Sequence, residues 1–434
     1  MKRIITILLL LSLPLFAQKL SKVYVMAEGG YSAGTSSLSM LDAATGTFEQ
    51  NIFTTSTLGL YPDGLVFYND TLYLAEQGSY GGSGKIYQLD TLGNVLNSAV
   101  VGVNPFSIAI ANNKAYLTNG PDNSVSVVNL SDLSLDTTIT VGVYPQEIIA
   151  YENYVFVGNT EEYMGTVDST VMVIDAETDE IIDTIVVAPD PASFAITNDR
   201  YLLVGCSVYG YGDTIYKIDL TTFAKVDSFT VADYGFGKDI SVDPNSNTIY
   251  FLGSYSDVVS LDLETGESSA VVSSTNFVYP YGYSYDYVNN THYVADAKDF
   301  SANGSLTAYD SLGTVINSYE TGVAPRRIVM KYVDGMTGIE DGDEVIAKEF
   351  RLNQNYPNPF NPTTKISFSI PAPSNVNLTV YNILGQKVTE LLNKEMNAGS
   401  FEVNFNASKL ASGIYYYRLQ AGDLVSTKKM MLVK

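Results

Sequence analysis

The chain has 434 residues, of which 46% are hydrophobic and 12% aromatic, so it is long enough for more than one domain and can bury large cores. Its formal charge of −23 at pH 7 disfavours binding to nucleic acid or anionic lipid, because the protein would repel their phosphates. The single cysteine, Cys206, excludes an internal disulfide, and its strand-like surroundings predict a small packed side chain.

Residues 1–17 are predicted to be a signal peptide. A basic start at Lys2-Arg3 precedes an apolar run over 4–13 and a small residue, Ala17, at the expected cleavage point. This run is shorter than the roughly 20 residues that a membrane-spanning helix needs, and no other run is long enough. We therefore expect a protein that leaves the cytoplasm and has no transmembrane segment.

One short phrase recurs seven times between residues 23 and 333: an apolar strand around an aromatic residue or Leu, then a second strand that ends in Asp or Asn. The centres of the first strands lie 40–49 residues apart. Four short strands in each such period predict an all-β fold in which residues 18–333 form a seven-bladed β-propeller. The centres are Tyr24, Tyr73, Tyr116, Phe156, Leu203, Tyr250 and Tyr293, and the second strands end at Asp42, Asp90, Asn129, Asp175, Asp219, Asp262 and Asp310.

The recurring Asp or Asn lies in a hairpin, often beside Thr and Gly. We expect its side chain to accept hydrogen bonds from backbone N–H groups two residues further on, which would fix the turn. A metal-binding role is disfavoured, because seven such residues spread around a ring could not share one ion.

The two ends of the repeat region predict how the ring closes. The chain starts with the second strand of a blade, and the repeats end with an isolated first strand at residues 326–333. If these two strands pair, the ring closes and no sheet edge is left exposed.

The phrases AYLTN (115–119), NSVSVVN (123–129) and TVGVYP (140–145) resemble the repeat of the YVTN-repeat propellers, which include surface-layer-like and periplasmic seven-bladed proteins. The resemblance covers about residues 20–333, although the fifth and sixth blades depart from it and DYGFGK (233–238) lacks the proline. It implies the propeller fold and a binding or scaffolding role.

The loops before the innermost strands are expected to gather at one mouth of the central channel. The side chains that follow them would then surround the opening and form a pocket for a small polar or glycan-like ligand. The alternative is that these side chains only fill the funnel after turns that proline sets. The candidate ligand-binding residues are Asp63, Phe106, Gln146, Lys238, Tyr281 and Arg326.

No catalytic residue, cofactor or metal site is predicted. The only histidine, His292, has neither a second His nor a Ser elbow nearby, so we expect a strand residue near the surface. The Gly-rich segment 78–84 lacks the lysine and helix of a phosphate-binding loop. The runner-up function is a lactonase-like hydrolase at the channel mouth, to which Asp63, Glu147, Asp239 and Arg326 could contribute.

Charge divides the chain near residue 349. Residues 350–434 carry nine Lys or Arg and four Asp or Glu, a net charge of +5, whereas residues 18–349 carry 13 and 43, a net charge of −30. The acidic stretch 334–349 is predicted to be a solvated linker. Six strand-like segments after it predict a second all-β unit, an immunoglobulin-like β-sandwich.

Several motifs of residues 350–434 resemble, in the same order, the type A C-terminal sorting domain of the type IX secretion system. They are NYPNPFNP (355–362), VYNILGQKV (380–388), LASGIYYYRL (410–419) and the basic last strand 428–434. The resemblance implies Sec export and then binding of this domain by the type IX translocon, and in many members cleavage of the domain. The sorting-signal residues are Tyr356, Pro357, Asn358, Pro359, Phe360, Gly385, Gly413, Tyr415, Lys428 and Lys429.

Together these features predict a secreted or surface-attached binding or scaffold protein. Its ligand is expected to be a small molecule, a glycan or a protein, and not nucleic acid.

Overall fold

The structure is a computed structural model. It describes residues 18–30, 34–54, 64–161, 165–207, 213–334, 350–352, 355, 358, 360–370, 373–383, 385–396, 399–422 and 424–433. The predicted signal peptide, Asp63 and residues 335–349 of the predicted linker lie outside the described residues. The chain divides into two compact units, Met1–Gly335 and Met336–Lys434.

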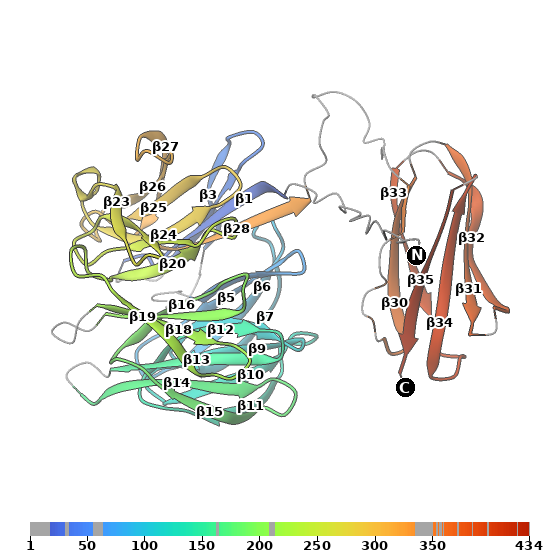
Figure 1. Ribbon diagram of the computed structural model, residues 1–434, viewed down its shortest axis with the longest axis horizontal. Helices are drawn as coiled ribbons and strands as arrows, with labels where there is room; N and C mark the ends of the chain where they lie inside the picture. The colour runs from blue at the N-terminus through green and yellow to red at the C-terminus, as the bar shows by residue number, and fades with distance from the viewer. Residues whose placement is uncertain are drawn as a thin grey trace, which may run out of the picture. The chain divides into compact units, whose positions relative to one another are not determined.

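The first unit is a seven-bladed β-propeller, as the repeats predict. Seven four-stranded antiparallel sheets form the blades (Figure 1). The innermost strands of neighbouring blades lie against one another all the way round, from β4 to β28 and back to β4. Closure into a ring leaves only short outer edges, which protects the sheets from pairing with other chains.

Each blade has one strand at the channel, two middle strands and one strand at the outer edge, in the following order from the channel outward. Blades 1 to 4 are β28 (Pro325–Asp334), β1 (Gln18–Ala27), β2 (Ser37–Asp42) and β3 (Phe48–Thr54); β4 (Gly64–Tyr68), β5 (Thr71–Glu76), β6 (Ser83–Leu89) and β7 (Val95–Val103); β8 (Pro105–Ala111), β9 (Lys114–Asn119), β10 (Ser124–Asn129) and β11 (Leu135–Thr140); β12 (Pro145–Tyr151), β13 (Tyr154–Glu161), β14 (Val167–Asp175) and β15 (Glu180–Val186).

Blades 5 to 7 are β16 (Pro191–Ile196), β17 (Tyr201–Cys206), β18 (Thr214–Asp219) and β19 (Lys225–Thr230); β20 (Lys238–Val242), β21 (Thr248–Leu252), β22 (Val258–Asp262) and β23 (Ser268–Val272); β24 (Pro280–Asp286), β25 (Thr291–Asp296), β26 (Asn303–Tyr309) and β27 (Val315–Val323). One 3-10 turn, η1 (Ser274–Asn276), precedes β24. Within the described residues, no helix is long and apolar enough to cross a membrane.

Pairing of β28 with β1 closes the ring, as predicted (Figure 1). The two strands run antiparallel, from Gln18 opposite Asp334 to Ala27 opposite Pro325. Residues 326–333 thus lie within β28, which also takes in Asp334 from the predicted linker. Main-chain hydrogen bonds between the first and last strands of the propeller hold the blades in a ring.

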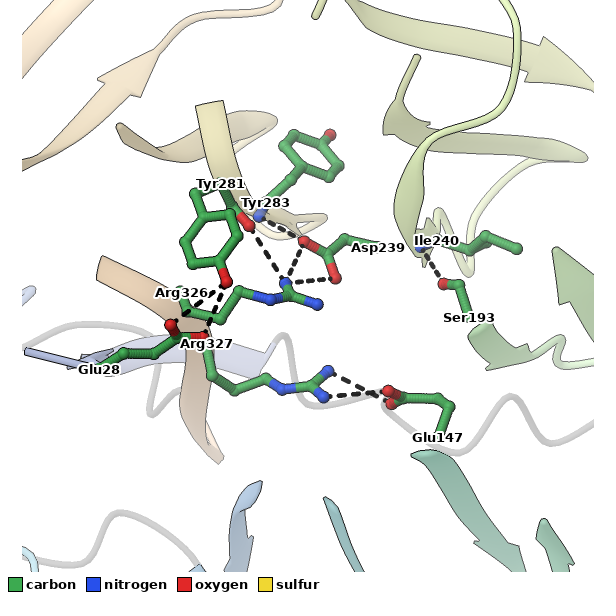
Figure 2. Close-up of polar contacts among 9 residues, drawn as sticks. All are labelled: Glu28, Glu147, Ser193, Asp239, Ile240, Tyr281, Tyr283, Arg326 and Arg327. Atoms are coloured by element: carbon green, nitrogen blue, oxygen red, sulfur yellow. Dashed lines mark hydrogen bonds and ion pairs between the residues drawn. The ribbon is translucent and has the colours of Figure 1, made fainter. Parts of the chain in front are cut away.

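Innermost strands begin with an irregular register that brings extra residues to the channel. In β8, residues 106 and 107 oppose the single Thr118 of β9, which is a β-bulge. Similar register shifts open β12, β16, β20, β24 and β28. Several of these strands start with proline, which is tolerated at the first position because its missing N–H breaks no ladder bond. The bulge allows two consecutive side chains, such as Arg326 and Arg327, to reach the channel (Figure 2).

The recurring Asp or Asn fixes the outer hairpin of each blade, as predicted. Oδ1 of Asp219 accepts hydrogen bonds from the N–H groups of Thr221 and Thr222, at 2.8 Å each. These bonds to the charged form lower the pKa of Asp219. Equivalent bonds are made by Asp42, Asp90, Asn129, Asp175, Asp262 and Asp310.

The hydrophobic cores lie between neighbouring blades. One core combines Tyr116 and Val127 of blade 3 with Val155 and Ile174 of blade 4. Cys206 is fully buried in the next core, between blades 4 and 5, which confirms its predicted packing role. Burial raises the pKa of its thiol to about 12, so the thiol stays protonated and unreactive.

The prediction that His292 lies near the surface is wrong. Its side chain on β25 is 1% exposed and packs against the rings of Tyr250, Tyr283 and Tyr285. The hydroxyl of Tyr283 lies 2.8 Å from Nδ1 of His292. Burial lowers the pKa of His292 to about 4. Because neighbouring blades cover both faces of a middle strand, the alternation of polar and apolar residues in the sequence does not indicate that the imidazole is enclosed.

The second unit contains two antiparallel sheets around one core. One sheet consists of β29 (Arg351–Leu352), β30 (Thr363–Ile370) and β33 (Gly399–Asn406), and the other of β32 (Lys387–Met396), β31 (Ser374–Asn382), β34 (Gly413–Ala421) and β35 (Leu424–Leu432). Phe368 of the first sheet and Val380 and Leu419 of the second share the core. The last strand, β35, begins at Leu424, four residues before its predicted start at 428.

Candidate functional site

The predicted mouth residues occupy equivalent positions at the start of the innermost strands. Each lies at the irregular register that opens its innermost strand. We call these positions the mouth ring, which in the described chain consists of Phe106, Gln146, Ala192, Lys238, Tyr281 and Arg326.

The structure brings three of the predicted residues together around the ring of Tyr281. Nζ of Lys238 lies 4.2 Å and Cζ of Arg326 lies 5.5 Å from the centre of that ring, both within the range of cation–π attraction. Arg326 also donates a hydrogen bond to the carbonyl oxygen of Tyr281, at 3.2 Å. Phe106 and Gln146 are half-buried on blades 3 and 4 and take no part in these three contacts.

A second ring of residues lies one position further along each strand, and it carries the strongest polar contacts. Nη1 of Arg326 reaches across from the mouth ring and bonds both oxygens of Asp239, at 3.0 and 2.9 Å (Figure 2). Each of these side chains is 10% exposed. The described members of the second ring are Gly64, Ser107, Glu147, Ser193, Asp239, Gly282 and Arg327.

A second ion pair joins opposite sides of the channel. The guanidinium of Arg327 donates to both oxygens of Glu147, at 3.3 and 3.0 Å (Figure 2). Such two-point pairing is among the strongest hydrogen-bonded arrangements of side chains. Both arginines belong to β28, whereas Glu147 belongs to blade 4 and Asp239 to blade 6. The strand that closes the ring therefore also links it across the channel.

Further hydrogen bonds fix side chains around these two ion pairs. Oδ2 of Asp239 accepts from the N–H of Tyr283 at 3.0 Å, and Oγ of Ser193 accepts from the N–H of Ile240 at 3.0 Å (Figure 2). The hydroxyl of Tyr281 donates to the carboxylate of Glu28, at 3.0 and 3.2 Å. Glu28 follows β1 and is 7% exposed, so this bond joins blade 7 to blade 1 in a largely dry setting.

Gly282 shows how closely the strands approach here. A Cβ at this position would lie 1.7 Å from the carbonyl oxygen of Arg326. A residue with a side chain would therefore push β24 away from β28 and disturb both arginines.

The Arg327–Glu147 pair borders two small cavities in the channel. One has a volume of about 130 Å³ and is also lined by Asp239, Tyr283 and Arg326. The other has a volume of about 260 Å³, and Leu65 and Ile108 contribute to its lining. Both volumes are below the roughly 300–1,000 Å³ of typical small-molecule sites.

Within the described residues, no group of three or more His, Cys, Asp or Glu side chains could hold a metal ion. His292, the only histidine, is enclosed between tyrosines of blades 6 and 7. The charged groups at the channel are instead arranged as guanidinium–carboxylate pairs, an arrangement that favours rigidity over proton transfer.

Reasoning from the sequence named every described member of the mouth ring except Ala192, but it missed Glu28. It named Glu147 and Asp239 only for the hydrolase alternative. The second ring could have been found by moving one residue along each strand from the mouth ring. Glu28 lies 253 residues from its partner Tyr281, so no local signal pointed to it.

In the second unit, part of the predicted sorting motif lies along the last strand. Oδ1 of Asn358 accepts a hydrogen bond from the N–H of Met431 at 2.8 Å. The N–H of Phe360 donates to the carbonyl of Met431, and the N–H of Val433 donates to the carbonyl of Phe360. The Phe360 side chain is 2% exposed, in the core of the unit. This segment therefore anchors the C-terminal strand.

The other predicted sorting residues are found at turns and on the last two strands. Gly385 has a positive φ of 74° in the turn after β31, and Gly413 begins β34. The hydroxyl of Tyr415 donates to the carbonyl of Ala411 at 2.8 Å, while Lys428 and Lys429 lie on β35. Tyr356, Pro357 and Pro359 lie outside the described residues.

Two family models match the chain. Residues 22–321 match the family described as "Domain of unknown function (DUF5074)", and residues 354–434 match the "Secretion system C-terminal sorting domain". The second match indicates secretion through the type IX system to the cell surface or the extracellular space. No curated protein matches the chain.

Solved structures of propeller proteins are similar to this chain. A quinonprotein alcohol dehydrogenase-like protein of Bacteroides thetaiotaomicron is 15% identical over 70% of this chain and 77% of its own, with a TM-score of 0.56. The periplasmic gluconolactonase PpgL of Pseudomonas aeruginosa is 14% identical over 71% and 99%, with a TM-score of 0.55. A putative 6-phosphogluconolactonase of Bacteroides uniformis is 14% identical over 72% and 100%, with a TM-score of 0.54. At these identities the similarity shows the fold alone.

Proposed function

This chain belongs to the DUF5074 family, and from that premise we propose that its propeller is a binding protein that acts at the cell surface or outside the cell. The main support is the arrangement of the channel residues. The guanidinium groups of Arg326 and Arg327 are paired with carboxylates across the channel, and the cavity beside them holds only about 130 Å³. A ligand is therefore expected to bind on the mouth face of the ring, not deep in the channel.

A lactonase-like hydrolase is the second candidate, because three residues named for it converge. Glu147, Asp239 and Arg326 line one cavity. However, each carboxylate is already bonded to a guanidinium across the channel. Catalysis would require breaking a buried ion pair before a proton could be taken from water. Binding is therefore the better-supported function.

The finer family assignment is also a proposal. The YVTN-like phrases occur in blades 3 and 4, where Asn119 of β9 and Asn159 of β13 pair with the prolines that begin the innermost strands. This shared geometry supports a place among the YVTN-repeat propellers and, with it, a binding or scaffolding role.

The second unit is proposed to be the part that the type IX translocon recognises. Anchoring of β35 by Asn358 and Phe360 supports this role, because it presents the basic C-terminal strand in one fixed conformation. Fractionation of the native host should find the mature chain outside the cell, and deletion of 350–434 should leave the propeller in the periplasm. Export of the truncated chain would overturn this part of the proposal.

The binding proposal is tested by comparing ligand binding with turnover. The purified protein is screened on a glycan array, and hydrolysis of simple sugar lactones is followed by acid release at constant pH. We expect array binding without lactone turnover. Turnover that is lost in Arg326→Ala, while the variant remains folded, would show the hydrolase function instead.

A further inference from the structure

A group of exposed apolar side chains extends the mouth ring outward on blade 7. Val278, Tyr279 and Phe300 are 74%, 49% and 37% exposed. The ring centres of Tyr279 and Phe300 are 4.9 Å apart at 70°, and those of Tyr281 and Phe300 are 5.0 Å apart at 76°. We call the surface formed by the rings of Tyr279 and Phe300, together with the adjacent Val278, the aromatic platform. Through Tyr281 it is continuous with Lys238 and Arg326 of the mouth ring.

The platform is held by a buried carboxylate at its base. Asp296 is 8% exposed and accepts hydrogen bonds from the N–H groups of Val278, Tyr279 and Lys298, at 2.9, 2.8 and 2.9 Å. The N–H of Ala297 donates to the carbonyl of Tyr279 at 2.9 Å, which ties the two loops together. The aromatic side chains are thus exposed on a backbone that is already ordered, so binding a ligand would cost little conformational entropy.

We propose that the aromatic platform binds a neutral polysaccharide, whose sugar rings stack on Tyr279 and Phe300. This inference rests on the proposed binding function and names the ligand class for the same face. The carbon-bound hydrogens of a sugar ring form an apolar surface that favours contact with aromatic faces. Its hydroxyl groups need acceptors at the edge, and the exposed carboxylate of Asp299 lies next to Phe300 in the chain.

Charge and size both favour a neutral glycan. Residues 18–349 carry a net charge of −30, which repels anionic polymers, whereas a neutral chain pays no such electrostatic penalty. Only three large apolar side chains form the platform, and a stable protein interface needs about 800 Å² from each partner. Two neighbouring exposed aromatic rings can each contact one sugar, which suits a chain of sugars better than a compact small molecule.

The test uses the mature full-length chain in affinity gel electrophoresis. Gels contain one soluble neutral polysaccharide (laminarin, xyloglucan, dextran or mannan) or the anionic alginate. We expect retardation by at least one neutral polymer, and at least tenfold weaker binding for Tyr279→Ala and for Phe300→Ala. The matched control is Tyr80→Ala, because Tyr80 is 80% exposed on blade 2, and its binding should stay within twofold of the unmodified protein.

Because Tyr279 and Phe300 are exposed, both variants are expected to fold, which circular dichroism checks. Equal binding by the platform variants and the unmodified protein would overturn the platform while leaving a binding function intact. Retardation by alginate alone, or by no polymer, would overturn the proposal of a neutral polysaccharide ligand. The same conclusion would follow if Tyr279→Ala instead abolished a defined complex with a host surface protein. Lactone turnover would contradict the proposed function itself, so the two failures are distinguishable.

Discussion

Carboxylates serve two regions of the propeller, the outer hairpins and the channel, and their bonds differ in reach. In the hairpins, Asp219 and Asp262 bond to N–H groups two and three residues on. At the channel, Asp239 bonds to Arg326 across 87 residues of sequence and Glu147 to Arg327 across 180. A hairpin carboxylate therefore stabilises its own turn, whereas a channel carboxylate joins distant blades and cannot lose its partner without leaving a buried charge.

The largest expected effect is at the Arg326–Asp239 pair. Arg326→Ala leaves the Asp239 carboxylate, 10% exposed, without this guanidinium, so we expect the free energy of unfolding to fall by about 3–5 kcal/mol. Urea denaturation measures this loss. The matched control is Arg200→Ala, because Arg200 and its partner Glu152 are each 58% exposed and such surface pairs contribute little to stability.

If both arginine variants lose the same stability, the largely buried pair at the channel contributes no more than an exposed pair. The double variant Arg326→Met, Asp239→Leu sharpens the test, because it removes both charges at once. We expect it to recover a large part of the loss.

The next effect concerns pH and the buried His292. Its pKa is about 4 in the folded protein against 6.5 in an exposed histidine, so the unfolded state takes up the proton first as the pH falls. Stability should therefore decline from about pH 6.5 to pH 4, by up to about 3 kcal/mol in total. Urea midpoints at pH 7.5, 5.5 and 4.5 measure it. His292→Gln should flatten the curve in this window, and an unchanged slope would contradict the assignment.

A smaller loss is expected for the bond between Tyr281 and Glu28. Tyr281→Phe removes a hydroxyl that donates to a carboxylate only 7% exposed, which should lower the free energy of unfolding by about 1–2 kcal/mol. Thermal and urea denaturation check this. The control is Tyr255→Phe, because Tyr255 is 68% exposed. A larger loss in the control than in Tyr281→Phe would speak against a structural role for this bond.

The smallest effect is expected in the outer hairpins. The pKa of Asp219 is lowered by hydrogen bonds from backbone N–H groups, so its stabilising effect is present above about pH 4 and is lost as the pH falls further. Asp219→Ala should slightly lower the stability of the protein at pH 7. The further fall in stability below pH 4 should be smaller in this variant than in the unmodified protein. The control is Asp227→Ala, whose carboxylate bonds only the next N–H group. A collapse of the whole propeller in Asp219→Ala would break the distinction between local and long-range carboxylates.

Much of the fold could be predicted because its determinants are local and repeated. Each blade carries its own strand phrase and hairpin Asp or Asn within about 45 residues, and the hairpin bonds of Asp90 and Asp310 span only two to four residues. The mouth position could be located because it follows the loop at the start of each innermost strand. The partners of these side chains could not be located, since ion pairs join strands whose separation along the chain carries no pattern.

The amino-acid sequence by itself determined the seven blades, the strand that closes the ring and the sorting unit, because period, alternation and short motifs express each of them within a few residues. Only the tertiary structure decided that Arg326 and Arg327 pair with Asp239 and Glu147, that His292 is enclosed, and that Tyr279 and Phe300 form an exposed platform. The physical reason is ring closure, which brings the first residues of distant strands together around one axis. Burial and charge then determine which of their side chains pair.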